Sequence, residues 1–299
     1  MNKYFGIFAV ILASLLWGTT GTAATFAPTL SPLFVGSFAM GIGGILQCGL
    51  AIYNIKQNHS SLTTHSRFLI VGALAVAIYP LAFYSSMRLS GVTIGTVVSI
   101  GSAPILSAII EYISRDFQVT KQWVIGALLG IIGMTMLAFS ENASTTVEYN
   151  HVGLGILLGL IAGFTYALYS WSARQLMLKG IDSKAAMGAT FGCGGLLLIP
   201  VMLITGTTFF AAWNNIAVGC YMALIPMFLG YLCYGYGLSK ISASLATTIS
   251  LLEPVIAAIL AMIIVGESLS LIAWIGMLFI FVCLIIVTLS SVIKNDIIN

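Results

Sequence analysis

Ala243–Val265 reads ASLATTISLLEPVIAAILAMIIV, an almost wholly apolar stretch of 23 residues with Glu253 and Pro254 near its centre. A run of about 20 apolar residues is what a helix needs to cross the hydrocarbon layer of a membrane. A charged side chain there costs roughly 2.5–3.5 kcal/mol on insertion scales, and a proline removes one backbone donor. The stretch therefore predicts a membrane-spanning helix whose two unfavourable residues are compensated by neighbouring helices or by a hydrated cavity.

The composition of the whole chain points the same way. Of its 299 residues, 60% are hydrophobic and 6% are charged, whereas a soluble domain has about 25% charged residues. We therefore expect an all-α polytopic membrane protein, with the lipid bilayer as its solvent. The net charge is +3 and the basic residues are spread along the chain, so no nucleic-acid partner is expected. The five cysteines lie in apolar runs without a C-x-x-C pair, which favours small buried side chains over a metal site.

Ten apolar stretches are long enough to be membrane spans. They run over Tyr4–Ala24, Leu33–Tyr53, Phe68–Met87, Val92–Ile113, Trp123–Phe139, Val152–Ala173, Ala185–Thr205, Ala217–Leu238, Ala243–Val265 and Leu271–Ser290. With the N-terminus in the cytoplasm, ten of the eleven Lys and Arg residues fall on the cytoplasmic side, and Arg88 is the exception. Basic residues concentrate on the cytoplasmic side of membrane proteins, so both termini are predicted to be cytoplasmic.

The two halves of the chain repeat one another. At a shift of 150 residues, Tyr84 meets Tyr234, Pro104 meets Pro254 and Gly126 meets Gly276. The predicted repeats are residues 1–145 and 146–299, with five helices each. Because five is an odd number, the second repeat enters the membrane from the opposite face, which makes the repeats inverted. Transporters with inverted repeats bind substrate near the membrane midplane and alternate by rocking one part against the other.

The chain resembles the drug/metabolite transporter superfamily, of the EamA type. The resemblance covers essentially the whole chain and rests on Leu16-Trp17-Gly18, Leu252-Glu253-Pro254-Val255, Gly266-Glu267 and Gly276 in their order and spacing. It implies a five-plus-five inverted fold, with the fifth and tenth helices at the periphery and a central cavity lined by the first, third, fourth, sixth, eighth and ninth. It also implies a small-metabolite cargo, often amino acids or related amines and carboxylates. The first repeat departs from the second, since Ala103 stands where Glu253 would be.

Glu253 is the first candidate functional residue, because a carboxylate inside a membrane span is a functional candidate by default. Held away from water it favours its neutral form, so it could exchange a proton or form an ion pair with an ammonium group of the substrate. A structural role, capping backbone groups freed by Pro254, remains open beside these two. Glu111 is expected to pair with Arg115, one helical turn later, at the membrane interface.

Aromatic and small polar residues within the spans form the second group of candidates. Tyrosine hydroxyls inside a membrane need partners, and a cavity for planar cargo would use them for stacking and hydrogen bonding. Packing between helices is the alternative for each aromatic residue, and back-bonding to the helix is the alternative for each small polar residue. The candidate substrate-binding residues are Trp17, Thr20, Tyr79, Tyr84, Ser99, Ser102, Tyr166, Tyr169, Tyr231 and Tyr234.

Prolines form the third group. Pro80 and Pro104 in the first repeat, and Pro226 and Pro254 in the second, interrupt two spans in corresponding places of each repeat. Interrupted helices in corresponding positions mark the binding region of many transporters. We therefore expect helix breaks or gating at these four residues.

These observations favour a secondary active transporter that moves a small metabolite by alternating access, in the direction of export. An amino acid or a related amine or carboxylate is the favoured cargo, protons are a possible coupling ion, and no cofactor or metal is expected. A multidrug, sugar, nucleotide or vitamin carrier of the same fold stays open, and so does the choice between monomer and homodimer. An intramembrane enzyme is disfavoured, because His59, His65 and His151 lie in loops. The expected location is the bacterial cytoplasmic (inner) membrane, as a multi-pass protein.

Overall fold

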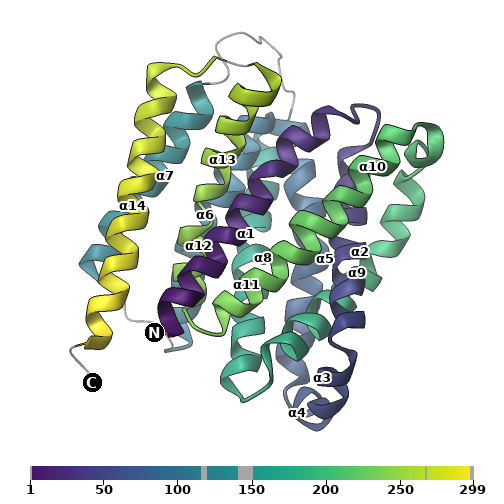
Figure 1. The fold of residues 1–299 in the computed structure, drawn as a ribbon, viewed down its shortest axis with the longest axis vertical. Coiled ribbons are helices and arrows are strands. Elements are labelled where there is room, and N and C mark those ends of the chain that lie inside the picture. Colours follow the sequence, from purple (N-terminus) through teal and green to yellow (C-terminus); the bar gives the residue numbers. More distant parts are fainter. Residues whose placement is uncertain (1, 116–119, 141–150, 267, 297–299) are drawn as a thin grey trace.

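The computed structural model describes residues 2–115, 120–140, 151–266 and 268–296 (Figure 1). Ten helices of the described chain are long and apolar enough to cross a membrane, as the sequence predicts. The described residues contain no β-strand. The predicted repeat boundary, between residues 145 and 146, and Glu267 lie outside the described residues.

The first half of the chain supplies five spans and two short helices. The spans are α1 (Asn2–Thr25), α2 (Pro32–Leu50), α5 (Ser66–Ser90), α6 (Val92–Ile113) and α7 (Lys121–Ser140), and α3 (Ile52–Gln57) and α4 (His59–Thr64) lie between the second and third. Figure 1 shows α3 and α4 at the same end of the bundle as both chain termini. We call this end the termini side and the other end the opposite side. The assignment of the termini side to the cytoplasm stays a prediction.

The second half also supplies five spans, two of which are composite. The continuous spans are α8 (Val152–Leu178), α9 (Ser183–Thr205) and α14 (Leu271–Asp296). The eighth span consists of α10 (Trp213–Met222), a π-helical segment η2 (Ala223–Leu229) and α11 (Gly230–Leu238), preceded by a short turn η1 (Phe209–Ala211). The ninth consists of α12 (Ala243–Ile249), α13 (Leu252–Leu260) and a π-helical segment η3 (Ala261–Val265).

The helix is irregular at two of the four predicted prolines, and it is broken only next to Pro254. Pro226 lies within the widened turns of η2, and Pro254 follows the break between α12 and α13. The helix breaks expected at Pro80 and Pro104 are wrong, since α5 and α6 continue through these residues. A proline removes only one donor from the hydrogen-bond ladder of its helix. Both proline rings are buried, so packing around them keeps each helix continuous.

The helices pack as two central groups and two outer pairs. In the centre, α8 packs along α5 and α6, and α1 packs along α11 and α13. The inverted repeat relates these two groups. In one, the first span packs on the eighth and ninth spans, and in the other, the sixth span packs on the third and fourth. Outside them, α2 pairs with α9 and α7 pairs with α14.

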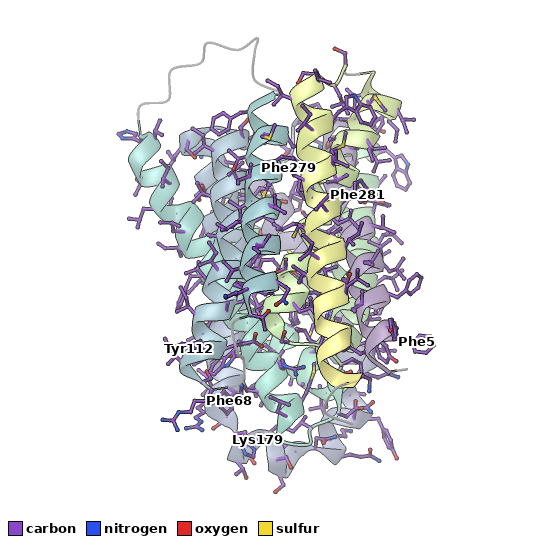
Figure 2. The ribbon with its side chains drawn as sticks, turned by 90° about the vertical axis from the view of Figure 1, so that its left-hand side faces the viewer. Phe5, Phe68, Tyr112, Lys179, Phe279 and Phe281 are labelled. Carbon is purple, nitrogen blue, oxygen red and sulfur yellow. The ribbon has the colours of Figure 1, made fainter. Side chains whose placement is uncertain are left out.

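The α7–α14 pair lies at the periphery, as the family resemblance implies. A side chain added at Gly133 would meet the Gly276 carbonyl oxygen at 2.4 Å, so the two backbones touch at these glycines. Such close approach between small residues is a common way for membrane helices to associate. Figure 2 shows α14 on the outside of the bundle with Phe281 on its outer surface, and this side chain is exposed. The face of α14 away from α7 is therefore available to lipid.

Candidate functional site

Trp17 joins α1 to the π-helical segment η2. Its indole Nε1 donates to the carbonyl oxygen of Pro226 at 2.9 Å, and the ring is buried. A side chain added at Gly230 would lie 2.8 Å from that nitrogen, so only a glycine leaves room for the indole. The ring also packs on Tyr231 and Tyr234, with centroids 4.8 Å and 5.1 Å away. Trp17 thus supports the irregular backbone that Pro226 creates.

Four of the predicted tyrosines form a buried cluster between α8 and the eighth and ninth spans. The hydroxyls of Tyr169 and Tyr231 lie 2.8 Å apart. Tyr234 pairs with the Ser170 hydroxyl at 2.9 Å, and Tyr166 donates to the Ser250 hydroxyl at 2.8 Å. All four rings are at most 3% exposed. Their hydroxyls are therefore satisfied by protein, which agrees with the packing alternative for these residues in this conformation.

Tyr79 and Tyr84 on α5 differ from this cluster because both remain partly exposed. Tyr79 stacks on Phe83, with centroids 5.7 Å apart, and lies 5.6 Å from the ring of Tyr166. The ring of Tyr84 fits against Gly36 of α2, where an added side chain would meet it at 2.4 Å. Both rings therefore keep accessible surface, which the four buried rings lack.

Glu253 lies at the start of α13, directly after the break in the ninth span. Its side chain is partly exposed. Among the described residues its carboxylate has no hydrogen-bond or ion-pair partner. The expected capping of backbone groups by this side chain is therefore not seen among the described residues.

The first helix packs against the backbone of Glu253. A side chain added at Gly18 would meet the Glu253 carbonyl oxygen at 2.9 Å and Ile256 at 2.6 Å. The sequence segments Leu16-Trp17-Gly18 and Leu252-Glu253-Pro254-Val255 are therefore in contact, and Gly18 is required for that contact. This explains physically why a glycine follows the tryptophan.

The predicted small polar residues bond mainly within their own helices. Thr20 donates to the Trp17 carbonyl at 2.7 Å, and Ser102 donates to the Ser99 carbonyl at 3.4 Å. Ser99 and Ser102 pack against Gly163 of α8, where an added side chain would lie 2.0 Å from the Ser102 hydroxyl. The buried Ser99 hydroxyl has no partner among the described residues. Back-bonding and helix packing describe these residues, with Thr20 and Ser102 still partly exposed.

Glu111 takes part in an interaction that the sequence does not predict. The expected pair with Arg115 is wrong: Glu111 is fully buried and accepts from the backbone amides of Ala243 and Ser244 at 2.7 Å and 2.9 Å. Arg174 of α8 lies 4.0 Å from the same carboxylate. The partners are more than 60 positions away along the chain, and no local pattern in the sequence indicates them.

Comparison with known proteins accords with this geometry. The sequence pattern of the EamA-like transporter family matches residues 4–139 and again residues 153–289. The chain belongs to the EamA-like transporter family. Relatives of this EamA-like transporter include the uncharacterized transporter YwfM of Bacillus subtilis, 28% identical over 93% of this chain and 92% of the relative. The uncharacterized inner membrane transporter YicL of Salmonella typhimurium is 26% identical over 96% of each chain.

The fold of this EamA-like transporter also matches a solved crystal structure. The TM-score is 0.80 at 16% identity, and the match covers 96% of this chain and 97% of the other. At that identity the likeness concerns the fold alone. The family and the ten apolar helices together make the chain a multi-pass membrane transporter, in which α1 contacts the eighth span through Trp17 and the ninth span through Gly18.

Proposed function

We propose that this EamA-like transporter is a secondary active transporter that moves a small amine-bearing or amino-acid-like metabolite by alternating access, in the direction of export. The observation that carries the proposal is the free carboxylate of Glu253. It lies in the middle of a membrane span, is partly exposed, and has no ion-pair or hydrogen-bond partner among the described residues. A charge left unpaired in a membrane is costly, so a proton or a cationic group of the cargo is expected to neutralise it.

The chemistry around Glu253 favours a cargo that combines an ammonium group with a planar or aromatic part. The carboxylate binds the ammonium group through charge-assisted hydrogen bonds. The stacked pair Tyr79 and Phe83 of α5 is partly exposed, and rings of this kind contact both planar groups and cations. The alternatives are a multidrug carrier for planar cations, which the same pair favours, and a carrier of sugars, nucleotides or vitamins.

We place this transporter in the cytoplasmic membrane of a bacterium, with both termini in the cytoplasm. Two observations support this placement. Basic residues are concentrated at the ends and loops that share a side with the termini, and one relative is named an inner membrane transporter. Monomer and homodimer both remain compatible with the proposal.

Counterflow in proteoliposomes tests the activity. Vesicles are loaded with one class of unlabelled compound at a time, beginning with aromatic amino acids and their amines, and uptake of the labelled compound is followed. Accumulation that depends on the internal load identifies both transport and cargo. Absence of counterflow with every amino acid and amine would contradict the proposed cargo class.

Glu253→Gln separates the two roles of the carboxylate. If Glu253 carries a proton, the variant should lose its response to a pH gradient while exchange of pre-loaded substrate persists. If Glu253 binds the ammonium group, both activities should fall together, while a well-folded variant keeps its thermal stability. Retention of both activities would contradict a transport role for this residue.

A further inference from the structure

The polar contacts between the two central helix groups are concentrated on the termini side. One group is α5, α6 and α8, and the other is α1 with the eighth and ninth spans. A series of polar contacts joins the first group to the second. It runs along α8 from Tyr166 toward the termini side and ends at Glu111 of α6. We call this series the polar ladder. It consists of the contacts Tyr166–Ser250, Tyr169–Tyr231, Ser170–Tyr234, Arg174–Leu238, Arg174–Ile241, Glu111–Ala243 and Glu111–Ser244.

The contacts of Arg174 and Glu111 form the charged end of the polar ladder. We call them its last rung. Glu111 of α6 accepts from the amides of Ala243 and Ser244 through both carboxylate oxygens. Arg174 donates to the carbonyl oxygen of Leu238 at 2.6 Å and to that of Ile241, and it lies 4.0 Å from the Glu111 carboxylate. Bonds of this charge-assisted kind are about twice as strong as neutral ones. Separating the two groups at this end must therefore break the strongest rung of the ladder.

The burial of the ninth span shows the same asymmetry. Every residue of α12, its first segment on the termini side, is buried. None of the residues of η3, its last segment on the opposite side, is buried, and Ile263 is 69% exposed. The termini side is therefore the closed side at this span.

The inverted repeat shows what the corresponding contacts on the opposite side would be. At the shift of 150, Glu111 corresponds to Ala261, and the start of α12 corresponds to the start of α6. No side chain of the described residues caps the start of α6, and alanine has no carboxylate with which to bind it. The most polar contact of the ladder thus has no counterpart in the other half.

Two further rungs also lack counterparts. At the shift of 149 that aligns the first and sixth spans, Arg174 corresponds to Thr25 and Ser170 corresponds to Gly21. Tyr84, the counterpart of Tyr234, is partly exposed and has no hydroxyl partner among the described residues. Among the described residues, the positions that correspond to the ladder would therefore close the opposite side mainly through apolar contacts.

We infer that Glu111, held beside Arg174, is a one-sided latch that keeps the termini side closed and biases the resting transporter toward the state open on the opposite side. This inference rests on the proposed alternating access. Glu111 is a positioning residue in this role, because it acts on the helices around the site and does not contact the cargo. Its effect should appear in the conformational equilibrium without any substrate present.

Ser107→Cys provides a reporter of opening on the termini side. Ser107 lies on α6 one turn before Glu111, is fully buried, and its hydroxyl has no partner among the described residues, so a thiol replaces it at little cost. A thiol reagent that cannot cross the bilayer is added to the side of the membrane that carries the termini. Labelling is measured by mass spectrometry on the peptide that contains residue 107, so that the native cysteines do not interfere.

In the Glu111→Gln background, labelling of the reporter should become faster by about tenfold, the shift expected from losing one hydrogen bond to a charged group. Asp182→Asn is the matched control. Asp182 also caps a helix and contacts the first half of the chain through Asn54, but this contact is exposed. Labelling in the control should stay within about twofold of the parent.

Equal labelling in Glu111→Gln and the parent, with both proteins folded, would overturn the latch, and so would an equal rise in the Asp182→Asn control. If Glu111→Gln does not yield monodisperse protein, Glu111→Asp takes its place, because it keeps the charge beside Arg174 but shortens its reach; the same rise is expected and the same result would overturn the inference. The assay uses no cargo. A failed latch with intact counterflow, or an intact latch without counterflow, therefore tells the two proposals apart.

Discussion

The indole of Trp17 donates its hydrogen bond to the backbone of the eighth span. Trp17→Phe keeps an aromatic ring but leaves the Pro226 carbonyl without its donor. We expect a loss of about 1–3 kcal/mol in stability, the usual cost of an unsatisfied buried polar group, measured as thermal unfolding in detergent. Trp171→Phe is the control, because the Trp171 indole nitrogen has no partner among the described residues. An equal loss in both variants would show that ring size, and not the hydrogen bond, matters.

The hydroxyl pair of Tyr169 and Tyr231 can be tested by a double-mutant cycle. Each Tyr→Phe change alone leaves the other hydroxyl unpaired, so the double variant should be more stable than the sum of the single losses predicts, by about 0.5–3 kcal/mol. Tyr221 donates to Thr19 in a separate contact, so Tyr169→Phe and Tyr221→Phe should be additive. Additivity in the first pair would contradict a coupled hydroxyl bond.

The four prolines illustrate how the same residue type acts differently in different helices. Pro80 and Pro104 lie in helices that continue through them, whereas Pro226 and Pro254 lie where the helix is widened or broken. The two irregular helices meet α1 at Trp17 and Gly18. An irregular backbone inside a membrane is tolerated where neighbouring groups satisfy it, and in this protein α1 supplies one such group.

The packing of α1 on α13 depends on Gly18. Gly18→Ala places a methyl group 2.6 Å from Ile256, so α1 and α13 must move apart. We expect a loss of about 1–3 kcal/mol in stability together with reduced counterflow, because Glu253 moves with its helix. Gly21→Ala on the same helix meets nothing within 4 Å and should leave both unchanged. Similar losses in the two variants would show that the contact with Ile256 is not the cause, because alanine has the higher helix propensity and should not destabilise α1 by itself.

Across the whole molecule, the ten spans bring both termini to one side (Figure 1). With that side in the cytoplasm, a fluorescent protein fused after residue 299 should fluoresce and a phosphatase fused there should be inactive. Fusions after Val265 end one span earlier and should show the reverse pattern. Phosphatase activity at the full-length end would contradict the predicted orientation, although the fold would remain the same.

Much of the architecture follows from local features of the sequence. The length of each apolar run determined the ten spans, because a helix must satisfy its own backbone bonds in lipid. The match of Pro104 with Pro254 and of Gly126 with Gly276 indicated the repeat. Glu253 could be singled out as well, since the cost of a charge in a membrane depends on its depth and needs no knowledge of its neighbours.

Contacts between distant residues could only be decided by the tertiary structure. The tyrosine hydroxyls bond to partners 62 to 84 positions away, and Glu111 binds amides 132 and 133 positions away in place of the nearby Arg115. Hydrogen bonds act over about 3 Å, and the packing of helices, not the order of the chain, determines which groups come that close. For the same reason, the sequence could propose Tyr166, Tyr169, Tyr231 and Tyr234 as ligand-binding residues, but only the structure showed that their hydroxyls bond to protein partners. Among the described residues, the side chains of Glu253, Tyr79 and Tyr84 have no hydrogen-bond partner.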